Sequence, residues 1–221
     1  MFTQFAFDLF TLIWYNVLSF ACFQKSFAYQ GTHKELWYCT TLHGIVCMTC
    51  SFCTIIRMSD IDNVCLDHVC FAWSRYLEWI ICCPLLISQI CIIGDFPIHT
   101  LLEVTTFTTG FCMSALIAVY SNILFGKILM VMQGIFYYIL LIVIVFSNLF
   151  KTWYTLNHVY KRAIKTNMTT ILVIWPLYVM LWVLGNDIFN VISKESEHNA
   201  ELVLSIIVKT VGATYVFQRP S

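Results

Sequence analysis

The segment ELVLSIIVKTVGATYVF, residues 201–217, carries one basic side chain, Lys209, in an almost wholly apolar setting. On a helix over residues 200–218, Lys209 lies about nine residues, or about 14 Å, from either end. A lysine side chain, about 6 Å long, cannot bring its charge to water from that depth. An unpaired charge there costs several kcal/mol, so Lys209 is expected to be paired, neutral or covalently modified.

A second group of ionisable residues lies in WSRYLEWIICCPLLISQI, residues 73–90. Arg75 and Glu78 are three residues apart, so they share one face of a helix. Taken alone, such a pair is more often an internal ion pair that fixes helix packing. Because Lys209 adds a third charge on another apolar segment, the two cations and one anion together indicate a functional site.

The elements that position these residues are expected to be membrane helices. The chain has 221 residues, of which 60% are hydrophobic and 11% charged, with a net charge of zero and a mean hydropathy of +0.80. A soluble domain carries about 25% charged residues, so the composition predicts an integral membrane protein and gives no support for nucleic-acid binding. Seven segments are apolar over the length of about 20 residues that a membrane helix needs: 4–24, 35–57, 69–93, 98–120, 128–150, 168–188 and 200–218. The predicted fold class is an all-α bundle of seven transmembrane helices, as one domain over residues 1–221.

The basic residues of the connecting segments predict the orientation of the bundle. With the N-terminus outside and the C-terminus inside, seven basic residues fall inside and three, including Arg57, fall in outside loops. This distribution follows the positive-inside rule. The glycosylation sequon Asn167-Met168-Thr169 would then face the cytoplasm and stay unmodified, and the location would be the plasma membrane.

The eleven cysteines lie mostly in apolar runs, in no paired or metal-type spacing, and are interpreted as small hydrophobic side chains. Cys47, Cys50 and Cys53 recur every three residues, which indicates one face of a helix rather than a metal site. The sequence contains no recognisable nucleophile–base pair or metal cluster, so an enzyme is not indicated.

The stretch RYLEWIICCPLL resembles the third-helix signature of microbial rhodopsins: Arg-Tyr, an acid and Trp, then two small polar residues and Pro. The resemblance covers essentially the whole chain and includes the lysine of the last helix, which carries retinal as a Schiff base in that family. It implies that Lys209 binds all-trans retinal and that Glu78 is its counterion. Arg75, one turn outward, would then help to keep Glu78 ionised.

The resemblance also implies a retinal pocket. Trp175, Tyr178 and Trp182 recur at intervals of three and four residues, which places them on one helix face. In the family such an aromatic face encloses the polyene, although the proline that follows the tyrosine there is Val179 here. The other implied pocket residues are Trp79, Cys83, Thr106, Gly110 and Gly134.

Two departures from the family pattern argue against an outward proton pump. Gln89 stands where pumps carry a carboxylate proton donor, and Ser205 stands where the family usually has an Asp one turn before the lysine. A third feature resembles channelrhodopsins: Cys83 matches a cysteine that pairs there with an acid of the fourth helix. Spacing to Gly110 places Glu103 at that acidic position, so Cys83 and Glu103 are expected to time channel closing.

The second predicted helix, with ELWYCTTLHGIVCM at residues 35–48, resembles the channelrhodopsin helix in which cation conductors carry several glutamates. Here Leu42 occupies the central gate position and His43 follows it. Because anion paths avoid carboxylates, the sequence favours a light-gated chloride channel, most similar to the compact algal and viral-type anion channelrhodopsins.

Three alternatives remain open. A cation or proton channel would use Asp8, Glu103 and Glu201 as its acids. A sensory rhodopsin would act through a partner without carrying current, and a seven-helix protein without retinal would show no visible absorption. A homodimer is suggested by the family resemblance alone.

Overall fold

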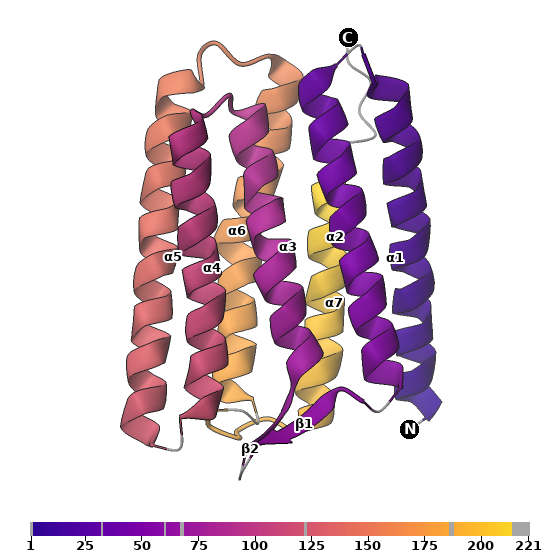
Figure 1. Ribbon diagram of the computed structural model, residues 1–221, viewed down its shortest axis with the longest axis vertical. Helices are drawn as coiled ribbons and strands as arrows, with labels where there is room; N and C mark the ends of the chain where they lie inside the picture. Colours follow the sequence, from indigo (N-terminus) through magenta and orange to yellow (C-terminus); the bar gives the residue numbers. More distant parts are fainter. Residues whose placement is uncertain are drawn as a thin grey trace.

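The computed structural model describes residues 2–31, 33–59, 61–66, 69–121, 123–185 and 188–213. Within them, seven helices run side by side as one bundle (Figure 1). The helices are α1 (Phe2–Tyr29), α2 (Lys34–Met58), α3 (Trp73–Ile93), α4 (Ile98–Tyr120), α5 (Leu124–Thr152), α6 (His158–Leu184) and α7 (Lys194–Ala213). Two short strands, β1 (Asn63–Leu66) and β2 (Val69–Ala72), form an antiparallel hairpin between α2 and α3.

The helices pack in the order of the chain and close into a ring. Each helix from α1 to α4 packs against the next, α6 packs against α7 and α3, and α7 contacts α1 and α2. The phenol of Tyr138 on α5 donates a hydrogen bond to the carbonyl of Ile171 on α6, 2.9 Å away. We call the end with the hairpin and the start of α7 the hairpin end, and the opposite end, where α7 reaches Ala213, the tail end (Figure 1).

The polarity of each helix follows its place in the ring. Helices α1 to α6 are long and apolar enough to cross a membrane, whereas α7 contains several charged residues. In α5 only 17% of the most apolar window is buried, so most of that helix faces lipid; in α2 the share is 61%. The bundle is therefore an integral membrane structure whose polar interior is built mainly from α2, α3 and α7.

The structure corrects the predicted start of the third helix. Residues 69–72 pair with residues 63–66 as β2 and β1, and α3 begins only at Trp73. Ser74 at this start is tied to the hairpin, because its backbone N–H donates to Asp62 Oδ1 at 2.9 Å. Residues 69–72 are apolar because they form a strand, in which β-branched and aromatic residues are common. Hydropathy alone does not distinguish such a strand from the start of an apolar helix.

Helices α6 and α7 also begin earlier than predicted, at residues 158 and 194 instead of 168 and 200. Asn157 caps α6 by accepting a hydrogen bond from the Val159 N–H at 2.9 Å, and Ser193 accepts one from the Ser196 N–H at 3.2 Å. Such caps allow a helix to continue into polar sequence beyond the membrane. The predicted end of the last helix, residues 214–218, lies outside the described residues.

The hairpin also corrects the interpretation of the cysteines. Cys65 is disulfide-bonded and lies opposite Cys70 in the antiparallel register, whereas nine other cysteines are free thiols. Disulfides form in oxidising compartments. The orientation with the hairpin end outside, where such a bond would form, stays a prediction.

We expect no glycan on the native sequon when the protein is made in eukaryotic cells, because Asn167 lies half-buried within α6 toward the tail end. A sequon in a short extension added before Met1 should be glycosylated. The measurement is gel mobility before and after endoglycosidase treatment. A glycan on Asn167 with none on the extension would mean that the orientation is reversed.

Candidate functional site

Lys209 and Glu78 meet in the interior of the bundle. The Lys209 Nζ atom lies 2.7 Å from Glu78 Oε1 and 2.7 Å from Ser205 Oγ, one turn earlier on α7. The two charged residues are only 5% and 4% exposed. The amine is thus both buried and paired, so its charge is balanced without contact with water.

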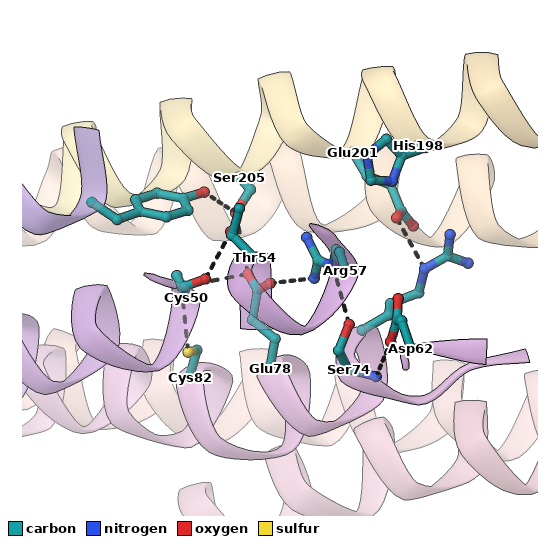
Figure 2. Close-up of polar contacts among 12 residues, drawn as sticks. Cys50, Thr54, Arg57, Asp62, Ser74, Glu78, Cys82, His198, Glu201 and Ser205 are labelled. Atoms are coloured by element: carbon teal, nitrogen blue, oxygen red, sulfur yellow. Dashed lines mark hydrogen bonds and ion pairs between the residues drawn. The ribbon is translucent and has the colours of Figure 1, made fainter. Parts of the chain in front are cut away.

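The carboxylate of Glu78 accepts hydrogen bonds from side chains of two helices, α2 and α7 (Figure 2). Its Oε1 atom also accepts from Ser205 Oγ at 3.2 Å and from the Cys50 thiol at 3.5 Å. Its Oε2 atom accepts from Nη2 of Arg57 at 2.6 Å. The hydroxyl of Ser205 further receives the Tyr15 phenol of α1 at 2.5 Å.

The arginine beside Glu78 is Arg57 and not the predicted Arg75. Arg75 is bound to two acids of α7, at 2.7 Å from Glu197 Oε1 and 2.9 Å from Glu201 Oε2. Sequence reasoning assigned Arg57 to an outside loop, but it lies in the last turn of α2 with a side chain only 14% exposed. The signal was present, because Arg57 falls two turns after Cys50 on the buried face of that helix.

Two of the three acids named as reserves for a cation path, Asp8 and Glu201, lie toward the hairpin end, whereas Glu103 is an exposed residue on the tail side. Asp8 is buried and lies 3.1 Å from His198 Nε2 of α7. Glu201 is bound to Arg75, as is Glu197, which sequence reasoning did not single out and which is 1% exposed. Asp8, Glu197 and Glu201 therefore each have a basic partner across a helix interface.

A cavity begins at the Lys209–Glu78 pair. The predicted residues Trp79, Cys83, Trp175 and Tyr178 line it. The ring of Trp79 meets that of Tyr178 edge-on, with centroids 6.2 Å apart, and Trp175 stacks on Phe111 at 6.4 Å.

A second cavity continues the first toward α5 and shares Trp79, Phe111 and Val179 with it. Gly134 and Trp182, two of the predicted pocket residues, line this part. A long apolar space with one amine at its end fits a conjugated aldehyde, because an amine and a carbonyl condense to an imine and the chain is enclosed by aromatic rings. The residues present therefore fit retinal.

Two predicted pocket residues lie elsewhere. Thr106 is exposed, and Gly110 packs against Tyr137, whose ring atoms would lie 3.1 Å from a Cβ at that position. The buried stripe of α4 contains Thr108, Cys112 and Ala115. Residues 106 and 110 are each two positions from Thr108. Two positions correspond to a rotation of about 200° around the helix axis, so neither residue lies on the same face as Thr108.

The predicted Cys83–Glu103 pair is not formed. Glu103 is exposed, and Cys83 lies beside Cys112 of α4 in the lining of the same pocket. Cys112 in turn donates to the Trp79 carbonyl at 3.5 Å. A thiol–carbonyl contact thus links α3 to α4 where a thiol–carboxyl contact was expected.

His43 links three helices on the tail side of Lys209. It is fully buried, with Nε2 at 2.8 Å from the backbone carbonyl of Lys209 and Nδ1 at 3.3 Å from Gln89 Oε1. Gly212 leaves room for the ring, because a Cβ there would lie 2.7 Å from the imidazole. The neighbouring Leu42 is half-buried.

The fold and this site define a seven-helix membrane protein with a buried lysine–carboxylate pair at one end of an aromatic pocket. The family model described as bacteriorhodopsin-like protein matches residues 7–215. The chain belongs to this family of microbial rhodopsins, whose cofactor is retinal bound as a Schiff base, and it is therefore a retinal protein rather than an enzyme.

Solved structures share the fold at low sequence identity. A cyanorhodopsin from the cyanobacterium Calothrix sp. NIES-2098 has a TM-score of 0.82 at 15% identity, over 95% of this chain and 93% of that one. A light-driven proton pump from Leptosphaeria maculans has a TM-score of 0.83 at 15% identity, over 96% and 92% of the two chains. The thermophilic rhodopsin of Rubrobacter xylanophilus has a TM-score of 0.77 at 16% identity, over 93% and 94%. No curated protein matches the sequence.

We expect Gly134→Phe to reduce retinal uptake strongly, because the new ring would fill the end of the cavity between α4 and α5. Gly134→Ala is the matched control, since its Cβ would lie 3.5 Å or more from the nearest atoms, an ordinary contact. The measurement is visible absorption after retinal is added, with thermal unfolding of the retinal-free protein as a test of folding. Normal pigment formation by Gly134→Phe would exclude this cavity as the retinal site.

Proposed function

We propose that the protein is a light-gated anion channel that conducts chloride, with retinal attached to Lys209 and Glu78 as the counterion. Retinal supplies light absorption and a change of shape at the end of the Lys209 side chain. Lys209, Glu78 and Ser205 hold the charge at that point, and Trp79, Trp175 and Tyr178 enclose the chain of the cofactor. Movement at Lys209 reaches His43 directly, through the backbone carbonyl that His43 binds.

The observation that carries the proposal is the distribution of carboxylates. Among the described residues, the buried carboxylates lie between the level of Glu78 and the hairpin end. They are Asp8, Asp62, Glu78 and Glu197. On the tail side, the described carboxylates of Glu35, Asp95 and Glu103 are exposed. In the part of the chain that the structure describes, the interior of that half has no buried acid to donate a proton or attract a cation, which favours anions.

His43 adds a polar group without a carboxylate to the same half. Its ring nitrogens lie 2.8 Å from the Lys209 carbonyl and 3.3 Å from the Gln89 amide. Its hydrogen bonds to α3 and α7 close the space between these helices and α2. We infer that His43 forms a constriction on the anion path in the dark state, with Leu42 beside it.

A light-gated cation or proton channel is the second candidate. It is favoured by the acids toward the hairpin end, Asp8, Glu197 and Glu201, which would face a cation entering there. In the dark state each of these acids is bound to a basic side chain, and we therefore rank this candidate below the anion channel. A sensory rhodopsin, which carries no current, is the third.

The test is a whole-cell photocurrent with retinal present, recorded before and after external chloride is replaced by a large impermeant anion. We expect the reversal potential to follow the chloride gradient. Lys209→Ala should give neither pigment nor current, because the variant has no amine for the cofactor. A reversal potential that follows sodium, potassium or protons would establish the second candidate, and pigment without current would establish a sensor.

We expect His43→Ala to slow channel closing or leave a current in the dark. The two cross-helix hydrogen bonds of His43 are together worth about 1–3 kcal/mol, which changes the ratio of open to closed channels roughly 5–150-fold. Met48→Ala on the same helix is the control, because Met48 is 56% exposed. Closing kinetics and dark current that match those of the control would remove His43 from the gate.

A further inference from the structure

Arg57 provides one of the two cationic contacts of Glu78. Its Nη2 atom lies 2.6 Å from Oε2 of the carboxylate, while Lys209 binds the other oxygen, Oε1, at 2.7 Å. The two cations therefore approach the carboxylate from different sides (Figure 2 shows the Arg57 side). A carboxylate between two cations remains balanced by one of them if the charge of the other is lost or moves away.

A second contact fixes the position of Arg57. Its Nε atom donates to Ser74 Oγ at 3.2 Å, and the Ser74 N–H donates to Asp62 Oδ1 at 2.9 Å (Figure 2). Ser74 is fully buried and Asp62 is 6% exposed. The base of the β1–β2 hairpin thus holds the guanidinium against Glu78, and the pair is shielded from water, where charge–charge interactions are stronger.

The other groups that face Glu78 do not replace Arg57. Besides Arg57 and Lys209, the titratable neighbours are Tyr15, Tyr178, Cys50, Cys53, Cys82 and Glu201. Phenols and thiols are neutral at acidic and neutral pH. Glu201 is an acid and is bound to Arg75, so among these groups Arg57 and Lys209 supply the positive charge at the carboxylate.

We propose that Arg57 is the positioning residue of the counterion: it keeps Glu78 ionised and oriented toward Lys209, and the Asp62–Ser74 contact holds Arg57 in place. This inference rests on the proposed roles of Lys209 and Glu78. The sequence suggested that Arg75 of α3 keeps Glu78 ionised. Here this role belongs to Arg57 of α2, which the hairpin holds in place. The proposal also implies that Glu78 keeps its charge when the positive charge at Lys209 changes.

The test is an acid titration of the absorption maximum of the pigment in the dark, because protonation of a counterion changes the colour of the pigment. An opposite charge within about 4–6 Å shifts the midpoint of a carboxyl group by about 1–3 pH units. We therefore expect Arg57→Gln to move the colour change up by about 1–3 pH units, and Arg57→Lys to restore most of the shift. Ser74→Ala, which keeps every charge, should cause a smaller shift in the same direction.

Arg75→Gln is the matched control and should move the midpoint less than Arg57→Gln. The opposite order would overturn the proposal, as would an unchanged midpoint in Arg57→Gln. Glu78→Gln should abolish the transition; if it persisted, another group such as Glu201 would be the one that titrates, and the proposal would be wrong.

A measurement without retinal separates this proposal from the function on which it rests. The thermal unfolding of retinal-free wild type, Arg57→Gln, Glu78→Gln and the double variant forms a mutant cycle. We expect the double variant to be less destabilised than the sum of the single variants, because each single change leaves a buried charge with one partner fewer. Additive effects would overturn the proposal even if pigment and photocurrent were normal, and a coupled cycle without pigment would overturn only the retinal site.

Discussion

The contact between Lys209 and Glu78 is the constraint on which the rest of the interior depends. Two opposite charges that are 5% and 4% exposed stabilise each other only while both stay in place. Removal of one partner from such a pair typically costs about 3–5 kcal/mol. Ser205 donates a hydrogen bond to one oxygen of Glu78 and accepts one from Tyr15, and Arg57 donates to the other oxygen of Glu78. Helices α1, α2, α3 and α7 are thus held together by polar contacts in a layer where apolar packing alone would be expected.

The central pair could be identified from the sequence because charged residues are rare in apolar segments. Lys209 and Glu78 stand out for that reason, and the aromatic residues Trp175, Tyr178 and Trp182 stand out by their helical spacing. The bundle of seven helices followed from segment length and hydropathy. These features depend on composition and on position along the chain, which a single sequence records directly.

The features that sequence reasoning missed depend on rotation and on the ends of helices. Thr106 and Glu103 lie at suitable depths on α4, but the helix turns them away from the interior. Arg57 appeared to lie in a loop because it is close to the end of an apolar segment, although its side chain points into the bundle. The caps at Asn157 and Ser193 extend α6 and α7 into polar sequence, where hydropathy gives no signal.

The uneven distribution of charge also affects how the membrane voltage falls across the protein. The half toward the hairpin end contains polarisable ion pairs such as Arg75–Glu197, whereas the tail half is packed with uncharged side chains such as Ile90, Val104 and Ile171. An electric field is weak in polarisable material and strong in apolar material. We therefore expect most of the voltage to fall between Lys209 and the tail end. Since one elementary charge moved through 100 mV corresponds to about 2.3 kcal/mol, an ion in the channel that we propose would do nearly all of its electrical work in this neutral half.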